Sequence, residues 1–140
     1  MTYKFLEHTA DLKILVEEKS LAGAFKTSAM ALREAMLEKI TVETIVTKYI
    51  KVESEDLQDL LYKFLEEFLF LLDAEDFIVS KIERIEIADN GNNGYVLRSR
   101  IVGDKASKYK FTNSVKAITF NEMFVKKQKD KFRIQFVLDV

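Results

Sequence analysis

The residues of this chain with the clearest chemical potential are carboxylates at its two ends. Asp11 closes the segment Glu7–Asp11, which reads EHTAD, and Asp139 lies in the final segment Phe136–Val140, which reads FVLDV. With Val140 as the last residue, its α-carboxylate adds a further pair of oxygens beside Asp139. Such a set contains only oxygen donors, and hard oxygen donors favour calcium or magnesium over zinc. Asp11, Asp139 and Val140 therefore form a candidate site for a divalent cation.

The same carboxylates have a plainer interpretation. Asp11 stands where an aspartate commonly caps a turn, and Asp139 falls on the polar face of a final strand, in contact with solvent. A shared cation site requires the two ends of the chain to meet in space, which the spacing along the sequence does not establish. From the residues alone, the plainer interpretation is favoured.

Nucleophilic catalysis finds little support in the sequence. The chain has no cysteine, and His8 is its only histidine. No serine stands in a Gly-x-Ser-x-Gly frame, and no glycine-rich loop is spaced to hold phosphate. We therefore predict no catalytic residue and interpret His8 as a hydrogen-bonded structural histidine. A metal-dependent phosphate-ester hydrolase would need a further base or a second metal ion, and the sequence offers no clear candidate for either.

The composition is that of a folded domain in a reducing compartment. The 140 residues are 48% hydrophobic and carry a formal net charge of −1. We expect one domain over residues 1–140. The near-neutral charge argues against unspecific binding of a nucleic acid backbone, which needs a basic surface. The lack of cysteine, of a leader segment and of an apolar stretch long enough to cross a bilayer predicts a cytoplasmic protein without membrane contact.

The segments that must position the carboxylates follow from the hydrophobic pattern. Alternating apolar residues predict short strands over residues 2–8 and 11–18, and a β-branched run predicts another over residues 43–54. Ser20 is a suitable N-cap for a first helix, whose apolar residues recur at helical spacing as far as Met36.

A second helix follows, for which Ser54 is the expected N-cap. Its apolar residues keep an unbroken helical spacing: Leu57, Leu60, Leu61, Phe64, Leu65, Phe68, Leu69 and Leu72. Tyr62, Phe70 and Leu71 widen this stripe, which predicts burial on more than one side of the helix. A face that binds a partner protein is the alternative.

The remainder of the chain reads as four strands joined in pairs. DNGNNG, residues 89–94, and KKQKDK, residues 126–131, are expected to be hairpin turns. In the last strand Ile134, Phe136 and Leu138 are expected to point inward, with Val137 and Asp139 on the other face. The element order predicts an α+β fold with two helices packed on largely antiparallel sheet.

Two basic features accompany these strands. The KKQKDK turn is expected to be a solvated hairpin end that discourages edge pairing, and Arg98 and Arg100 share one face of their strand. Contact with RNA or with an acidic protein surface is the alternative interpretation of both.

Several segments together resemble the archease family. They include YKFLEHTADLKI near the start, VESEDLQDLLYKFLEEFLFLLDAEDF across the second helix, and IQFVLDV at the end. The resemblance covers essentially the whole chain, and EHTAD combined with the terminal LDV is its most specific part. It implies a small α+β fold built on strand-helix-strand-strand (SHS2-like) modules.

The resemblance also implies a function. Archeases are accessory proteins of the tRNA-splicing RNA ligase, which uses GTP and manganese to join exon halves. They are non-catalytic activators that promote guanylylation and multiple turnover of the ligase and can broaden its nucleotide use. The ligands of the family's metal site map onto Asp11, Asp139 and Val140, with calcium as the expected ion and magnesium or manganese as alternatives.

The ligase is therefore the expected protein partner, and contact with RNA is expected to be indirect or weak. The alternative is a chaperone-like modulator of an RNA-modifying enzyme such as a tRNA methyltransferase. Two departures from the family pattern stand out: Asn121 replaces a common histidine, and Ala22 and Gly23 replace acidic residues in the first turn of the first helix. Neither departure alters the expected metal ligands.

Overall fold

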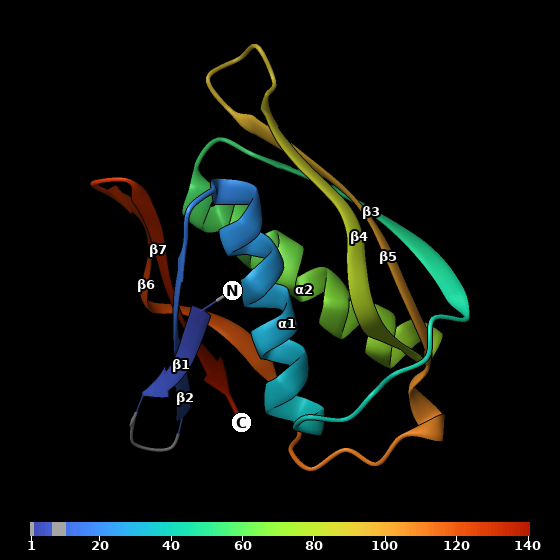
Figure 1. The fold of residues 1–140 in the computed structure, drawn as a ribbon. Coiled ribbons are helices and arrows are strands. Elements are labelled where there is room, and N and C mark those ends of the chain that lie inside the picture. The colour runs from blue at the N-terminus through green and yellow to red at the C-terminus, as the bar shows by residue number, and fades with distance from the viewer. Residues whose placement is uncertain (1, 7–10) are drawn as a thin grey trace.

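The computed structural model describes residues 2–6 and 11–140, so the predictions for Glu7 and His8 lie outside the described residues (Figure 1). In chain order the elements are β1 (Thr2–Leu6), β2 (Asp11–Glu18), α1 (Leu21–Leu37), β3 (Val46–Ser54), α2 (Leu57–Glu75), β4 (Phe77–Asp89), β5 (Tyr95–Lys105), the short 3₁₀ helix η1 (Ala106–Lys108), β6 (Ala117–Gln128) and β7 (Lys131–Asp139). This order confirms the predicted succession of strands and helices. The α+β class is confirmed with it.

The strands form two sheets with the helices between them (Figure 1). One sheet has the order β1-β2-β7-β6 and the other the order β3-β5-β4, and the paired strands in both are antiparallel. Helix α1 contacts β2 in the first sheet and β4 in the second, while α2 contacts β6 and β3. Each helix therefore buries two sides, one against each sheet.

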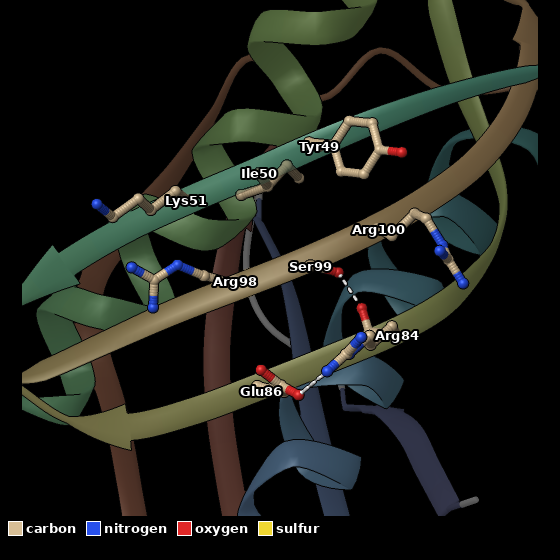
Figure 2. Close-up of a pocket in the computed structure, with 8 residues that line it drawn as sticks. All are labelled: Tyr49, Ile50, Lys51, Arg84, Glu86, Arg98, Ser99 and Arg100. Carbon is tan, nitrogen blue, oxygen red and sulfur yellow. Dashed lines mark hydrogen bonds and ion pairs between the residues drawn. The ribbon is translucent and has the colours of Figure 1, made fainter.

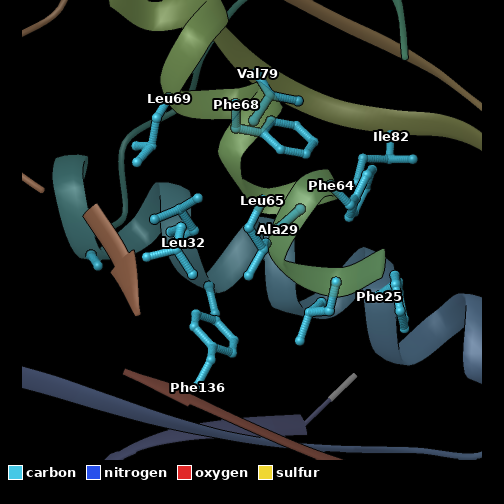
Figure 3. Packing of buried hydrophobic residues seen from close by; sticks show 14 of the residues in the cluster. Phe25, Ala29, Leu32, Phe64, Leu65, Phe68, Leu69, Val79, Ile82 and Phe136 are labelled. Atoms are coloured by element: carbon cyan, nitrogen blue, oxygen red, sulfur yellow. The ribbon is translucent and has the colours of Figure 1, made fainter. Parts of the chain in front are cut away.

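The core lies where the two helices meet the inner faces of the sheets (Figure 3). Phe25 of α1, Phe64 of α2 and Phe136 of β7 are fully buried there. The ring centroids of Phe25 and Phe64 lie 6.1 Å apart, a contact distance for aromatic pairs. The predicted burial of α2 on more than one side is confirmed at Leu71, whereas Phe70 is 55% exposed. None of the helices in the described parts of the chain has the length and apolar character needed to cross a membrane.

The caps of the two helices show which local signals the sequence carries. Ser20 caps α1 as predicted, because its Oγ accepts a hydrogen bond of 3.0 Å from the Gly23 amide. The prediction of Ser54 as the cap of α2 is wrong. The cap is Asp56, whose Oδ1 accepts from the Asp59 amide at 2.8 Å. Ser54 still ends β3, and its hydroxyl donates to the Asp59 carboxylate at 2.7 Å, so it supports the cap from outside the helix.

Candidate metal centre

Asp11 and Asp139 lie directly opposite each other in the first sheet. Strands β2 and β7 pair antiparallel with Asp11 against Asp139, and Asp139 faces Ala117 of β6 on its other side. Side chains of directly opposed residues project from the same face, with Cβ atoms about 4.5–5.5 Å apart. Both aspartates are half-buried. The fold therefore brings together two carboxylates from the two ends of the chain.

The hydrophobic residues of β2 and β7 hold this register. Ile14 pairs with Phe136, and Val16 pairs with Ile134. All four side chains are fully buried on the face that meets the helices. A shift of one residue would turn these side chains toward solvent, so burial strongly specifies the pairing. The same pairing fixes Asp11 opposite Asp139.

The end of β7 is also held from its other side. The amide of Lys116, just before β6, donates to the carbonyl of Asp139 at 2.7 Å. Val140 follows immediately and is 41% exposed. The backbone of Asp139 is thus fixed between β2 and β6, whereas the residue after it reaches the surface.

A bulge in β6 covers part of the face that carries the aspartates. The β6–β7 register shifts between Thr119 and Phe124. Within the bulge, the Glu122 carboxylate pairs with the Lys13 ammonium at 2.9 Å, and the Glu122 carbonyl accepts from Gln135 Nε2 at 2.9 Å. Val137 is fully buried although the sequence placed it on the polar face, and it lies between Lys13 of β2 and Thr119 of β6. The hydrophobic pattern gave no signal for this bulge.

Lys13 lies two residues from Asp11 and on the same face of β2. Its charge is engaged by Glu122, so the pair Lys13–Glu122 forms the rim of the candidate site. The site face therefore combines two aspartates at its end with a salt bridge next to them.

The donors of the candidate site fit a hard cation. Within residues 2–6 and 11–140, no three His, Cys, Asp or Glu side chains are grouped closely enough to hold a metal ion. Asp11 and Asp139 thus supply two carboxylates, and a complete site needs at least one more donor. Oxygen donors of this kind suit calcium, magnesium or manganese rather than zinc.

Asn121, which the sequence analysis singled out, lies in the β6 bulge. Asn121 is exposed, and its amide donates to Thr119 Oγ1 at 3.3 Å. The preceding Phe120 stacks on Tyr62 of α2 with ring centroids 4.3 Å apart, although it is 50% exposed. The stacked ring attaches the bulge to α2, a contact that the sequence pattern did not reveal.

These observations define a small α+β protein with two sheets, two central helices and a pair of opposed aspartates where β2 begins and β7 ends. The model of the "Archease protein family (MTH1598/TM1083)" matches residues 3–140. The chain belongs to the archease family.

The relatives support this assignment over the full length. The chain is 36% identical to the protein archease of Pyrobaculum neutrophilum, covering 99% of this chain and 95% of that one. It is 35% identical to the protein archease of Thermococcus kodakarensis, covering 99% and 98%.

Solved structures share the fold. The solution structure of Methanobacterium thermoautotrophicum protein 1598 matches with a TM-score of 0.85 and 28% identity, covering 99% of this chain and 98% of that one. The crystal structure of a Thermotoga maritima protein, described as an archease and possible chaperone, matches with a TM-score of 0.64 and 18% identity, covering 98% and 96%. The latter likeness concerns the fold alone.

Proposed function

We propose that this protein is a non-catalytic activator of the tRNA-splicing RNA ligase and acts through a divalent metal ion held at the surface. Asp11 and Asp139 bind the ion, and in a chain that ends at Val140 the α-carboxylate of that residue completes the set. Calcium is the expected ion. The activator promotes guanylylation and multiple turnover of the ligase.

The opposition of Asp11 and Asp139 in the β2–β7 register carries this proposal. Like charges directly opposite in a sheet are destabilising, and a bound cation removes that repulsion. The register that creates the pair is fixed by buried hydrophobic residues, so the two carboxylates are held opposite each other without an ion. Because both aspartates are only half-buried, the pair is open to a cation and to a partner protein.

Activation requires the docked protein to favour one state of the ligase. If this protein bound the resting and the guanylylation-competent states of the ligase with equal affinity, the balance between these states would not change, however tight the binding. A cation held at the interface provides such a difference, because it is attracted to the ligase state that gathers nucleotide phosphates. The residues of this chain bind and present the ion, and the ligase performs the chemistry.

Single-turnover guanylylation of the ligase tests the proposal. The wild-type protein is expected to accelerate the reaction, and Asp11→Ala is expected to abolish this acceleration. A circular dichroism melt checks that the variant remains folded. Asp130→Ala is the matched control, because Asp130 is exposed in the hairpin turn at the opposite end of β7. Full activation of the ligase by Asp11→Ala would show that the acidic site is not needed for activation.

Isothermal titration calorimetry separates metal binding from ligase activation. The wild-type protein is expected to take up one calcium ion, and Asp11→Ala and Asp139→Ala none. Extension of the chain beyond Val140 by a short Gly-Ser segment moves the α-carboxylate away without altering a side chain. Unchanged calcium affinity in the extended protein would remove Val140 from the ligand set.

Exposed aromatic side chains support a second candidate function, a chaperone-like modulator of an RNA-modifying enzyme. Phe5, Phe70 and Phe120 are 44%, 55% and 50% exposed. A protein that shields a client through such surfaces would not depend on the aspartates. Suppression of client aggregation that Asp11→Ala leaves intact and Phe70→Ala weakens would favour this function.

A further inference from the structure

The outer face of the three-stranded sheet carries a basic and aromatic surface that has no part in the proposed metal site. Strand β5 lies between β3 and β4, and the helices pack on the other face of this sheet (Figure 2). Two cross-strand rows face outward: Tyr49–Arg100–Arg84, and Lys51–Arg98–Glu86. These six residues belong to a sheet that contains neither Asp11 nor Asp139.

The rows enclose a shallow depression of about 420 Å³. Its floor includes Ile50 and Ser99, which are buried between the outward-facing residues of their strands. The Ser99 hydroxyl donates to the Arg84 carbonyl at 2.8 Å, which ties β5 to β4 beneath the surface. The depression is therefore built on a rigid sheet rather than on loops.

The aromatic ring of the surface is unusually exposed. Tyr49 has 76% of its surface accessible, and its cross-strand neighbour on β5 is Arg100 (Figure 2). A tyrosine on the open face of a sheet gives up favourable burial unless something stacks on it. The ring offers a flat apolar face for stacking and a hydroxyl that donates and accepts hydrogen bonds.

The charges of the surface divide into paired and unpaired groups. Arg84 forms an ion pair with Glu86, and Arg100 pairs with Glu83 at 3.2 Å. Among the described residues, Lys51 and Arg98 have no ion-pair partner, and both are exposed. They are directly opposite each other on β3 and β5. Two adjacent unpaired cations thus lie next to the exposed tyrosine row.

We infer that this face binds a single strand of RNA, with Lys51 and Arg98 contacting phosphates and Tyr49 stacking on a base. Single-stranded nucleic acids are held by basic grooves that track the backbone and by aromatic rings on which bases stack. In this inference the Tyr49 hydroxyl contacts a ribose 2′-hydroxyl, the group by which a protein tells RNA from DNA.

An acidic protein segment is the competing occupant. It would use the cations in the same way, but it gives no reason for a flat, exposed aromatic ring beside them. The two rows lie about 7 Å apart along each strand, so the cations and the ring are spread along the strand direction. The combination of an exposed ring and unpaired cations therefore favours a nucleic acid strand.

Fluorescence anisotropy with a labelled oligouridylate of about ten nucleotides tests the inference. Wild-type protein is expected to bind, with an affinity that falls as salt rises. The double variant Lys51→Ala/Arg98→Ala is expected to lose affinity and to reduce the slope of log K against log salt by about 1.4, since each phosphate contact contributes about 0.7. Absence of binding by the wild-type protein would overturn the inference.

Variants of Tyr49 separate stacking from charge. Tyr49→Ala is expected to weaken binding about 5- to 160-fold with an unchanged salt slope, because a stacked base is lost but no phosphate contact is lost. Tyr49→Phe is expected to retain RNA affinity while reducing the preference for RNA over DNA of the same sequence. Equal wild-type affinity for the two strands would overturn the assignment to RNA.

The hairpin turn between β6 and β7 supplies the matched control. Lys127→Ala/Lys131→Ala removes the same charge from the other basic feature of the chain and is expected to leave binding nearly unchanged. An equal loss of RNA affinity in this variant would show that the affinity depends on net charge alone. Binding of a polyglutamate peptide that competes with the oligonucleotide and tolerates Tyr49→Ala would instead assign the surface to an acidic protein. Both outcomes would contradict the inference.

Discussion

The side-chain oxygen of Ser20 caps the start of α1. The amide of Gly23 donates to Ser20 Oγ, and a Cβ added at Gly23 would lie only 2.8 Å from the same oxygen. The sequence suggests that Gly23 weakens the helix, since glycine costs roughly 1 kcal/mol relative to alanine in a helix interior. The structure shows that the cap occupies the space that a larger residue would need.

We therefore expect Gly23→Ala to leave the free energy of unfolding within about 0.5 kcal/mol of the wild type, because a propensity gain and a disturbed cap offset each other. In the Ser20→Gly background the oxygen is gone, and the same substitution should stabilise the protein by about 1 kcal/mol. Urea unfolding of the four proteins of this double-mutant cycle measures the coupling. Simple additivity of the two changes would contradict the explanation.

Residue-scale signals predicted the caps only in part. Ser20 stands alone before its helix, and the sequence identified it. Ser54 and Asp56 are both good capping residues, and the structure places the cap at Asp56 because the strand β3 continues as far as Ser54. The choice depended on where the strand ends, which the local sequence does not determine.

At the scale of elements, periodicity predicted the strands and helices, but not what ends them. The last turn of α1 has no basic residue. Its final carbonyls are instead satisfied from a distant segment: the amides of Thr112 and Asn113 donate to the Met36 carbonyl at 2.8 and 3.2 Å, and the Asn113 side chain donates to the Ala35 carbonyl at 3.0 Å. These hydrogen-bond partners are far from α1 in the sequence, so no local pattern predicts them.

Asp104 links the end of β5 to the segment that follows it and, through Tyr109, to the segment before β3. Its carboxylate, at the end of β5, accepts from the Tyr109 hydroxyl at 2.8 Å and from the Lys105 amide at 2.8 Å, and it pairs with Lys108. The Tyr109 hydroxyl in turn accepts from the Glu43 amide at 3.0 Å. The hydrogen bond from Tyr109 is the main reason that the pKa of Asp104 lies below its ordinary value, and the Lys105 amide and Lys108 lower it further.

A carboxyl group whose pKa is lowered in the folded state stabilises the protein above its unfolded pKa of about 3.9, and this contribution is lost as the pH falls through the lower folded value. We expect Asp104→Asn to be less stable than the wild type near neutral pH and to approach it in acid. Urea unfolding from about pH 7 to about pH 3 measures the difference. A difference that stays constant over this range would show that the carboxylate charge is not the cause; Asp130→Asn serves as the control.

For the whole molecule, the sequence predicted the class and the element order, whereas the division into two sheets depends on pairings between distant strands. The pairing of β2 with β7 was the decisive unknown for the candidate site. The hydrophobic residues of each strand specify which face is buried, but only the folded chain shows that these two strands are neighbours. The cross-strand neighbours Arg98 and Lys51 were missed for the same reason, although Arg98 was noted as part of a basic strand face.

The meeting of the two ends makes the stability of the whole fold dependent on the proposed ion. If the proposed site binds calcium, unfolding separates Asp11 from Asp139, so the ion binds the native state alone. It then stabilises that state by about 2.7 kcal/mol at a concentration about one hundred times its dissociation constant. For a chain of this length, that corresponds to a rise of roughly 10 °C in the melting temperature. The repulsion between the two aspartates therefore lowers the stability of the β2–β7 pair, and a bound ion raises it.

Asp139→Asn is expected to reveal both effects. Without divalent ions, the variant should melt at the same temperature as the wild type or slightly above it, because one of two opposed charges is removed. With calcium, the wild type should become the more stable protein, since the variant no longer gains from the ion. Calorimetric melts in chelator and in calcium, with Asp130→Asn as a control that keeps the full calcium effect, measure this reversal. An equal rise in melting temperature for Asp139→Asn and the wild type would place the calcium ion elsewhere on the molecule.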